Sequence, residues 1–205
     1  MTVTDIPQTE ITGIILAGGR GSRMGGVDKG LVPLRGEPMI THVAARLKPQ
    51  VGTLLINANR NLDAYAHLGF PVVPDRFSGF LGPLAGIASG LLTATTPYVV
   101  TAPCDSPLLP LDLVARLARA LAAEQAGIAV AHDGERAHPV FLLVRRELGA
   151  DLLDFLGAGG RKIDQWFTRH RLAVADFRDA AQAFINVNHD EERATLEARL
   201  AETAP

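Results

Sequence analysis

A glycine-rich segment that directly follows an apolar run constrains the fold of this chain most. The run 11–16 predicts a buried strand, and residues 16–30 read Leu-Ala-Gly-Gly-Arg-Gly-Ser-Arg-Met-Gly-Gly-Val-Asp-Lys-Gly. A glycine-rich turn between a strand and a helix presents backbone N–H groups with no side chains in the way, and Arg23 and Lys29 add positive charge beside them. The sequence therefore predicts a phosphate site at the end of the first strand, with a helix after it.

Two better-known glycine loops do not match this segment. A Walker A loop needs Ser or Thr after its lysine, whereas Gly30 follows Lys29. The dinucleotide fingerprint G-x-G-x-x-G can begin at Gly19, but Met24 then stands where its third glycine belongs. A dinucleotide fold also needs a carboxylate near the end of the second strand, and Asn57 ends the expected second strand. These mismatches disfavour a P-loop ATPase and a nicotinamide-dependent enzyme.

The composition is that of an ordinary globular protein, with 47% hydrophobic residues, 20% charged residues and a net charge of −2. Nucleic acids and anionic membrane surfaces are disfavoured as partners because both require a basic excess. Cys104 is the one cysteine, which fits a thiol-reducing compartment. Residues 1–10 lack the features of a signal peptide, and no apolar run reaches the roughly 18 residues that span a bilayer. We therefore expect a cytoplasmic protein.

Strand-like and helix-like segments alternate along the chain, which favours one α/β domain, 1–205, with a mostly parallel sheet. The expected strands are 11–16, 53–57, 72–73, 98–102, 128–132, 140–144, 172–174 and 183–186. The expected helices are 38–48, 61–68, 83–92, 110–124, 147–156, 162–170 and 190–201. Ligands of open α/β sheets lie beyond the carboxyl ends of the strands. The residues after Leu16, Asn57, Val73 and Ala102 should therefore meet.

The glycine-rich segment resembles the signature of nucleotidyltransferases, L-A-G-G-x-G-x-R-M-G followed by a lysine. Its second half, G-G-x-D-K-G, resembles one branch of them, the molybdenum cofactor guanylyltransferases. Further segments that resemble this branch follow in order: Asn57-Ala-Asn59, Gly82-Pro-Leu-Ala-Gly86, Pro103-Cys-Asp-Ser-Pro107, His132-Asp-Gly-Glu-Arg136, His138-Pro139 and Asn186-Val-Asn188. The resemblance implies a Rossmann-like three-layer αβα nucleotidyltransferase fold. It also implies a nucleotide-binding half, about 11–110, and an acceptor-binding half, about 111–201.

The same resemblance implies a reaction and its partners. GMP would pass from GTP to the terminal phosphate of molybdopterin, or of its molybdenum-loaded form, with release of pyrophosphate and with Mg²⁺ as cofactor. Other proteins of molybdenum cofactor biosynthesis and chaperones of recipient molybdoenzymes are further expected partners. Cytidylyltransferases that use the same acceptor resemble L-A-A-G in the loop, so Gly18 favours guanine. A non-catalytic GTP-binding chaperone is disfavoured because both Lys29 and Asp105 are present.

Three charged residues are the candidates for the chemistry of such a transfer. Asp105 follows the strand 98–102 and is the expected magnesium ligand, with an Asx turn or a helix cap as the alternative. Lys29 is expected to hold α- and β-phosphate oxygens while pyrophosphate leaves, with a solvated surface lysine as the alternative. Arg23 either grips β- and γ-phosphate oxygens or pairs with Asp28, and Asp28 is a candidate tether for the loop.

The nucleotide contacts that the resemblance implies are Leu16, Ala17, Gly18, Gly19, Gly21, Lys29, Asn57, Asp75 and Asp105. A carboxylate suits the N–H donors of guanine and an amide suits either kind of group. Whether Asn57 or Asp75 contacts the base rather than the ribose stays open, as does a turn role for Asp75 after Pro74. Cys104 is expected to be a small buried residue, because no partner that would lower its pKa is evident.

The candidates for the acceptor site are His138, Arg161, Lys162, Asn186 and Asn188. Arg161 and Lys162 follow a glycine-rich turn at an expected helix start, a second candidate anion site. Asn186 and Asn188 alternate in an expected extended segment, so that both amides would face one side, toward a pterin edge. Two alternatives stay open: Asn188 as the cap of the last helix, and His138 as a packed side chain.

Overall fold

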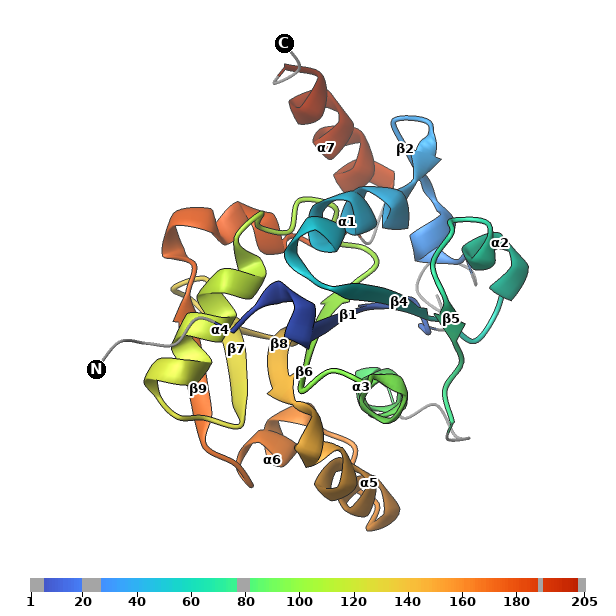
Figure 1. The fold of residues 1–205 in the computed structure, drawn as a ribbon. Helices are drawn as coiled ribbons and strands as arrows, with labels where there is room; N and C mark the ends of the chain where they lie inside the picture. The colour runs from blue at the N-terminus through green and yellow to red at the C-terminus, as the bar shows by residue number, and fades with distance from the viewer. Residues whose placement is uncertain (1–5, 20–26, 77–81, 188–189, 203–205) are drawn as a thin grey trace.

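A seven-stranded sheet forms the centre of the computed structural model, which describes residues 6–19, 27–76, 82–187 and 190–202 (Figure 1). Its strands, in order across the sheet, are β5 (Val72–Val73), β4 (Thr53–Asn57), β1 (Ile11–Leu16), β6 (Tyr98–Pro103), β8 (Ala137–Arg145), β7 (Ile128–His132) and β9 (Leu172–Asp176). β8 is antiparallel to both of its neighbours, and the other pairs are parallel. The mostly parallel sheet predicted from the sequence is confirmed.

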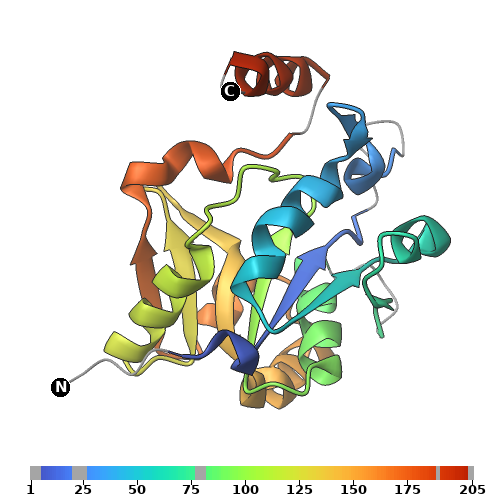
Figure 2. The same ribbon diagram turned by 45° about the horizontal axis from the view of Figure 1, so that its top comes forward.

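Helices cover both faces of the sheet and make a three-layer structure (Figures 1 and 2). One face packs against α1 (Met39–Leu47) and α4 (Leu113–Ala123). The other packs against α3 (Pro83–Thr93), α5 (Gly149–Gly157) and α6 (Ile163–Phe167). The described residues also form α2 (Leu62–Ala66), α7 (Asp190–Glu202) and the 3-10 helices η1 (Gln8–Glu10), η3 (Lys29–Leu31), η4 (Lys48–Gln50), η5 (Arg146–Leu148) and η6 (Arg178–Phe184). No helix within the described ranges is long and apolar enough to cross a membrane.

Burial on both faces explains the apolar character of the central strands. In β1, Ile11 and Ile15 pack toward α1 and α4, and Ile14 packs toward α3. Strands covered on both faces read as nearly continuous apolar runs. The bounds of β1, β4 and β7 coincide with the sequence expectation for this reason, and those of the half-buried edge strand β5 coincide as well. α3 lies close against β1 because Gly90 has no side chain, and a Cβ atom there would overlap Cδ1 of Ile14.

The helix expected over 38–48 is present as α1, but further structure that the sequence did not predict lies between it and the glycine-rich loop. Only one 3-10 turn, η3, follows the loop directly. A hairpin of β2 (Pro33–Leu34) and β3 (Glu37–Pro38) then separates η3 from α1. Both residues of the hairpin turn, Arg35 and Gly36, have positive φ, as a tight two-residue turn requires. The hairpin supports α7, because the Arg35 N–H donates to Glu197 and Leu196 packs with Leu34.

The strand expected over 183–186 is wrong. Residues 178–184 form the 3-10 helix η6, and the chain then continues over 185–187 without joining the sheet. Phe184 and Ile185 favour a strand by type, but Phe184 is buried against ring side chains of the core. The sheet ends at β9 instead.

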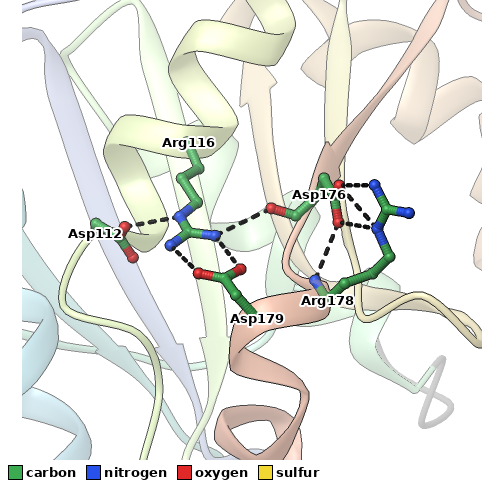
Figure 3. A network of polar contacts seen from close by, with 5 residues as sticks. All are labelled: Asp112, Arg116, Asp176, Arg178 and Asp179. Atoms are coloured by element: carbon green, nitrogen blue, oxygen red, sulfur yellow. Dashed lines mark hydrogen bonds and ion pairs between the residues drawn. The ribbon is translucent and has the colours of Figure 1, made fainter.

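A network of charged side chains fastens η6 to α4 (Figure 3). The Arg116 guanidinium donates to both carboxylate oxygens of Asp179, at 2.6 and 2.7 Å, and to Asp112 at 2.7 Å. It also lies 4.9 Å from the centroid of the Phe177 ring. Asp176 and Arg178 form a second, local pair in the same network. Because η6 leads into residues 185–187, the network also fixes where that segment crosses the carboxyl edge of the sheet.

Candidate functional site

The carboxyl ends of four strands lie at one edge of the sheet. Leu16, the last residue of β1, pairs with Asn57 of β4 and with Pro103 of β6, and Asn57 pairs with Val73 of β5. The sequence prediction that the residues after these ends meet is confirmed for the part of the loop that the structure describes: the N–H of Ala17 donates to Asn57 O at 2.8 Å. This edge carries most of the candidate nucleotide residues.

Lys29 and Asp105 form an ion pair at this edge, with 3.1 Å between Nζ and Oδ2. Their side chains are 22% and 11% exposed, so both are sheltered while remaining open to solvent. The loop that carries Asp105 is pinned from two sides, because Cys104 N donates to Leu16 O and Val187 N donates to Asp105 O. The structure thus brings together the two residues that the sequence assigned to phosphate and magnesium. The Asp105 carboxylate bonds to Lys29 rather than capping α4, which begins after Asp112.

Asp28 anchors the end of the glycine-rich loop. Its carboxylate, 7% exposed, accepts hydrogen bonds from Tyr65 Oη at 2.5 Å and from Asn61 Nδ2 at 2.9 Å. Arg60 Nε lies 3.5 Å away and completes the charge balance. Burial, with the Cys104 thiol and Asp28 nearby, raises the pKa of Tyr65 well above its usual value, so its hydroxyl stays a donor. The tether role considered for Asp28 is therefore supported.

The glycine after Lys29 has a structural reason of its own. A Cβ atom on Gly30 would lie 2.6 Å from Tyr65 Oη and 3.3 Å from Sγ of Cys104. Only glycine lets the tyrosine hydroxyl pass this point and reach Asp28. Asp28 and Gly30 therefore set the position of Lys29 between them. Asp28 is the tether, and Gly30 leaves room for the Tyr65 hydroxyl that holds Asp28.

Asn57 and Asp75 contact each other. Asn57 Nδ2 donates to Asp75 Oδ1 at 2.9 Å and to Val73 O at 3.0 Å. Asn59, which the sequence reasoning did not select, also bonds to Asp75: its Nδ2 donates to Oδ2 at 2.8 Å, and its Oδ1 accepts from the Asp75 N–H at 2.8 Å. Its signal was its position two residues after Asn57, since alternate residues of an extended segment face one side.

The first glycine of the loop lies against these amides. A Cβ atom on Gly18 would lie 2.8 Å from Asn59 Nδ2 and 3.3 Å from Asn57 Oδ1. From the α3 side, a Cβ atom on Gly86 would overlap Asn57 Oδ1. The amide of Asn57 is therefore enclosed between the loop and α3, and Asn57 is only 2% exposed.

Cys104 is buried next to these residues. Burial, and the nearby Asp105 and Asp28 carboxylates, raise the pKa of its thiol well above its ordinary value. A nucleophilic cysteine needs the opposite shift. The geometry supports the expected role of a small buried residue.

His138 is packed rather than directed at solvent. Its Nε2 lies 2.7 Å from Asp133 Oδ2, its ring stacks on Phe184 with 4.6 Å between centroids, and it is 8% exposed. Hydrogen bonds from the Arg136 N–H, from His138 and from the Glu135 N–H hold the pKa of Asp133 well below its usual range. The geometry therefore favours the interpretation of His138 as a packed side chain. Its stack on Phe184 also helps to hold the start of the segment 185–187 in place.

The other acceptor candidates lie in different surroundings. Asn186 Oδ1 accepts from Ser106 Oγ at 2.7 Å, which places Asn186 beside the Asp105 loop. Arg161 lies between α5 and α6, on the opposite face of the sheet from α1, and its Nη1 donates to the Leu156 and Gly160 carbonyls. Lys162 is the residue before α6 and is exposed. Within the described residues, no hydrogen bond or ion pair joins Arg161 or Lys162 to Asn186.

Three of the candidates, Gly21, Arg23 and Asn188, lie outside the described residues, so their expected roles stay predictions. Tyr65, Asn61 and Arg60 join the site unpredicted, because the sequence offers no pattern that pairs them with Asp28. No group of three or more His, Cys, Asp or Glu side chains suited to a metal ion occurs among the residues that the structure describes.

Known proteins that are similar to this chain are nucleotidyltransferases, in agreement with the geometry of the site. Residues 13–174 match the model of a MobA-like NTP transferase domain. The chain is 55% identical over 199 residues to a molybdenum cofactor guanylyltransferase of Cupriavidus necator, covering 95% of this chain and 100% of that protein. A protein of the same description from Shewanella sp. strain MR-4 is 51% identical over 191 residues, covering 93% of this chain and 97% of that protein.

The fold of this chain is also similar to that of a solved structure. Molybdopterin-guanine dinucleotide biosynthesis protein A of Archaeoglobus fulgidus superposes with a TM-score of 0.78 at 19% identity, covering 94% of this chain and 100% of that one. The nucleotidyltransferase fold expected from the sequence is thereby confirmed. With a family match across most of its length and full-length relatives above 50% identity, the chain belongs to the MobA-like NTP transferases, in the branch of the molybdenum cofactor guanylyltransferases.

Proposed function

We infer that this protein is a nucleotidyltransferase that moves GMP from GTP to the terminal phosphate of molybdopterin, or of its molybdenum-loaded form, and releases pyrophosphate. The observation that carries this function is the Lys29–Asp105 pair at the carboxyl edge of the sheet, next to the glycine-rich loop. Full-length relatives described as molybdenum cofactor guanylyltransferases support guanine as the base and this acceptor.

The transfer needs little covalent help from the protein. An oxygen of the acceptor phosphate forms a bond to the α-phosphorus of GTP, and the bond from that phosphorus to the bridging oxygen of the β-phosphate breaks. The bond electrons leave with pyrophosphate. Because the acceptor phosphate is already ionised, the reaction requires no strong general base. Positioning of the two phosphates and neutralisation of their charge supply most of the rate.

In this proposal the loop and two charged side chains hold the triphosphate. The backbone of residues 16–21 faces the phosphates, Lys29 contacts α- and β-phosphate oxygens, and Arg23 contacts the outer phosphates. Asp105 would hold Mg²⁺, which supplies charge neutralisation when bound. Its position beside Lys29 at the carboxyl edge of the sheet fits a cation shared with the substrate.

Asn57 and Asp75 are proposed to contact the guanosine, and the acceptor is proposed to bind on the C-terminal side. Asn186 is supported best among the acceptor candidates, because it bonds to Ser106 beside Asp105. In this proposal His138 stacks on Phe184 and so helps to hold the following segment, 185–187, in place. Arg161, Lys162 and Asn188 stay proposals on the sequence pattern alone, as does the division into a nucleotide-binding and an acceptor-binding half.

Substitution of Asp105 tests the proposed chemistry. Asp105→Ala should abolish Mg²⁺-dependent pyrophosphate release from GTP and molybdopterin, with the thermal unfolding midpoint within a few degrees of the unmodified protein. Gln165→Ala, which removes an exposed amide on α6, is the matched control and should keep full turnover. Near-normal turnover by folded Asp105→Ala would remove Asp105 from the mechanism.

Paired titrations test the separation of the two ligand sites. Asn186→Ala and Arg161→Ala should weaken molybdopterin binding or transfer and leave the Kd for GTP nearly unchanged. Lys29→Ala should weaken GTP binding about tenfold or more, since a charge-assisted contact to phosphate is lost. If the Asn186 and Arg161 variants lose GTP as severely as Lys29→Ala, the proposed division is wrong.

A further inference from the structure

We propose that Asn59 is a positioning residue that gives the protein its selectivity for guanine by fixing the carboxylate plane of Asp75. The inference rests on the proposed function and goes beyond it, because it assigns the selectivity to a residue that does not itself contact the nucleotide.

Asn57 alone cannot orient Asp75. It donates to one carboxylate oxygen, Oδ1, and a carboxylate held at one oxygen still turns about its own bond to Cβ. Asn59 supplies the second point, since its Nδ2 donates to Oδ2 of Asp75 at 2.8 Å. It also accepts the backbone N–H of Asp75 at 2.8 Å, so that the same side chain fixes the main chain and the carboxylate. The two asparagines together determine the plane of the Asp75 carboxylate.

Asn57 and Asn59 together clamp the Asp75 carboxylate, and the position of Asn59 favours a functional reason for this clamp. Asn59 is exposed, whereas Asn57 is buried, and hydrogen bonds made by an exposed amide contribute little to folding because water competes for both groups. The clamp lies directly beside the phosphate loop, because a Cβ atom on Gly18 would come within 2.8 Å of Asn59 Nδ2. A nucleotide whose phosphates lie along the loop therefore has its nucleoside near Asp75.

The chemistry of the clamped carboxylate suits guanine. Each carboxylate oxygen accepts one amide N–H from the asparagines and has capacity for a second donor. Guanine presents two neighbouring donors, N1–H and the 2-amino group, at the spacing of two carboxylate oxygens. Cytosine and adenine each present one amino donor next to a ring-nitrogen acceptor, which a carboxylate repels. A fixed carboxylate plane thus distinguishes guanine from both, whereas a rotating one pairs well with a single donor.

Calorimetric titration with GTP and with inosine triphosphate, which lacks the 2-amino group, tests the proposal in the absence of molybdopterin. The unmodified protein should bind GTP about tenfold more tightly than inosine triphosphate, the effect of one lost hydrogen bond. In Asn59→Ala the affinity for GTP should fall about tenfold while that for inosine triphosphate changes little, so that the ratio approaches one. Gly18→Ala should reduce the ratio in the same way, and the double variant should add nothing further.

The controls separate this proposal from a general structural effect. Gln165→Ala should keep the unmodified ratio, and the thermal midpoint of Asn59→Ala should match that of the unmodified protein. Equal losses for GTP and inosine triphosphate in Asn59→Ala, or no loss at all, would overturn the proposal. So would a reduced preference for GTP over 2′-deoxy-GTP with an unchanged ratio to inosine triphosphate, because Asp75 would then contact the ribose. If the unmodified protein binds GTP no better than CTP, the proposed function itself fails.

Discussion

Removal of one hydroxyl, in Tyr65→Phe, should weaken both the fold and the nucleotide site. Tyr65 is fully buried and donates to Asp28 at 2.5 Å, and the phenylalanine ring keeps all other packing of the side chain. Asp28 then keeps Asn61 and Arg60 as partners but loses one donor in a buried position. A hydrogen bond to a charged group contributes about 1.5–3 kcal/mol. We expect the free energy of unfolding to fall by about that amount.

Tyr65→Phe should also weaken phosphate binding at Lys29, because Asp28 directly precedes Lys29. Urea denaturation should show a lower midpoint with an unchanged slope, and calorimetry should show a weaker affinity for GTP. Tyr98→Phe is the matched control, since the Tyr98 hydroxyl donates no hydrogen bond to any described residue and its loss should change the stability by less than about 0.5 kcal/mol. Equal stability and equal GTP affinity of the two variants would refute the tether.

Two further substitutions test the enclosure of Asn57 and the dependence of the folding stability on acid pH. Gly86→Ala places a Cβ atom on Asn57 Oδ1 and should lower both the affinity for GTP, by calorimetry, and the stability by about 1–3 kcal/mol, by denaturation; an unchanged affinity would contradict the enclosure. Hydrogen bonds from the Arg136 N–H and from His138 lower the pKa of Asp133 in the folded state, so its stabilising effect is present above the unfolded pKa of about 4 and is lost as the pH falls further. Asp133→Asn should therefore be less stable than the unmodified protein at pH 6, and the difference should shrink toward pH 2; a constant difference would contradict this.

The sequence predicts the central sheet well and the connections between its ends less well. β1, β4 and β7 have the expected bounds because burial on both faces leaves a clear apolar run. The strand expected over 183–186 fails because the burial of Phe184 comes from a ring stack with His138 and not from pairing within the sheet. Such a stack joins residues far apart in the chain, and local patterns do not encode it.

The same distinction applies to the site. Lys29 and Asp105 were predictable as neighbours, because each follows a strand whose carboxyl end lies at the same edge. The tether of Asp28 was predictable as a possibility but its partners were not, since Tyr65 and Asn61 reach it from the segment around α2. The acceptor candidates were selected from local patterns, the glycine-rich turn before Arg161 and Lys162 and the alternation of Asn186 and Asn188, and local patterns carry no information on the distance between segments.

A panel of nucleotides shows whether this protein transfers GMP to molybdopterin. The purified protein is incubated with Mg²⁺, molybdopterin and either GTP, CTP, ATP or UTP, and both pyrophosphate and the mass of the pterin product are measured. We expect pyrophosphate release with GTP far above that with the other nucleotides, and a product heavier by one GMP unit. Equal turnover with CTP, or GTP binding without pyrophosphate release, would contradict it.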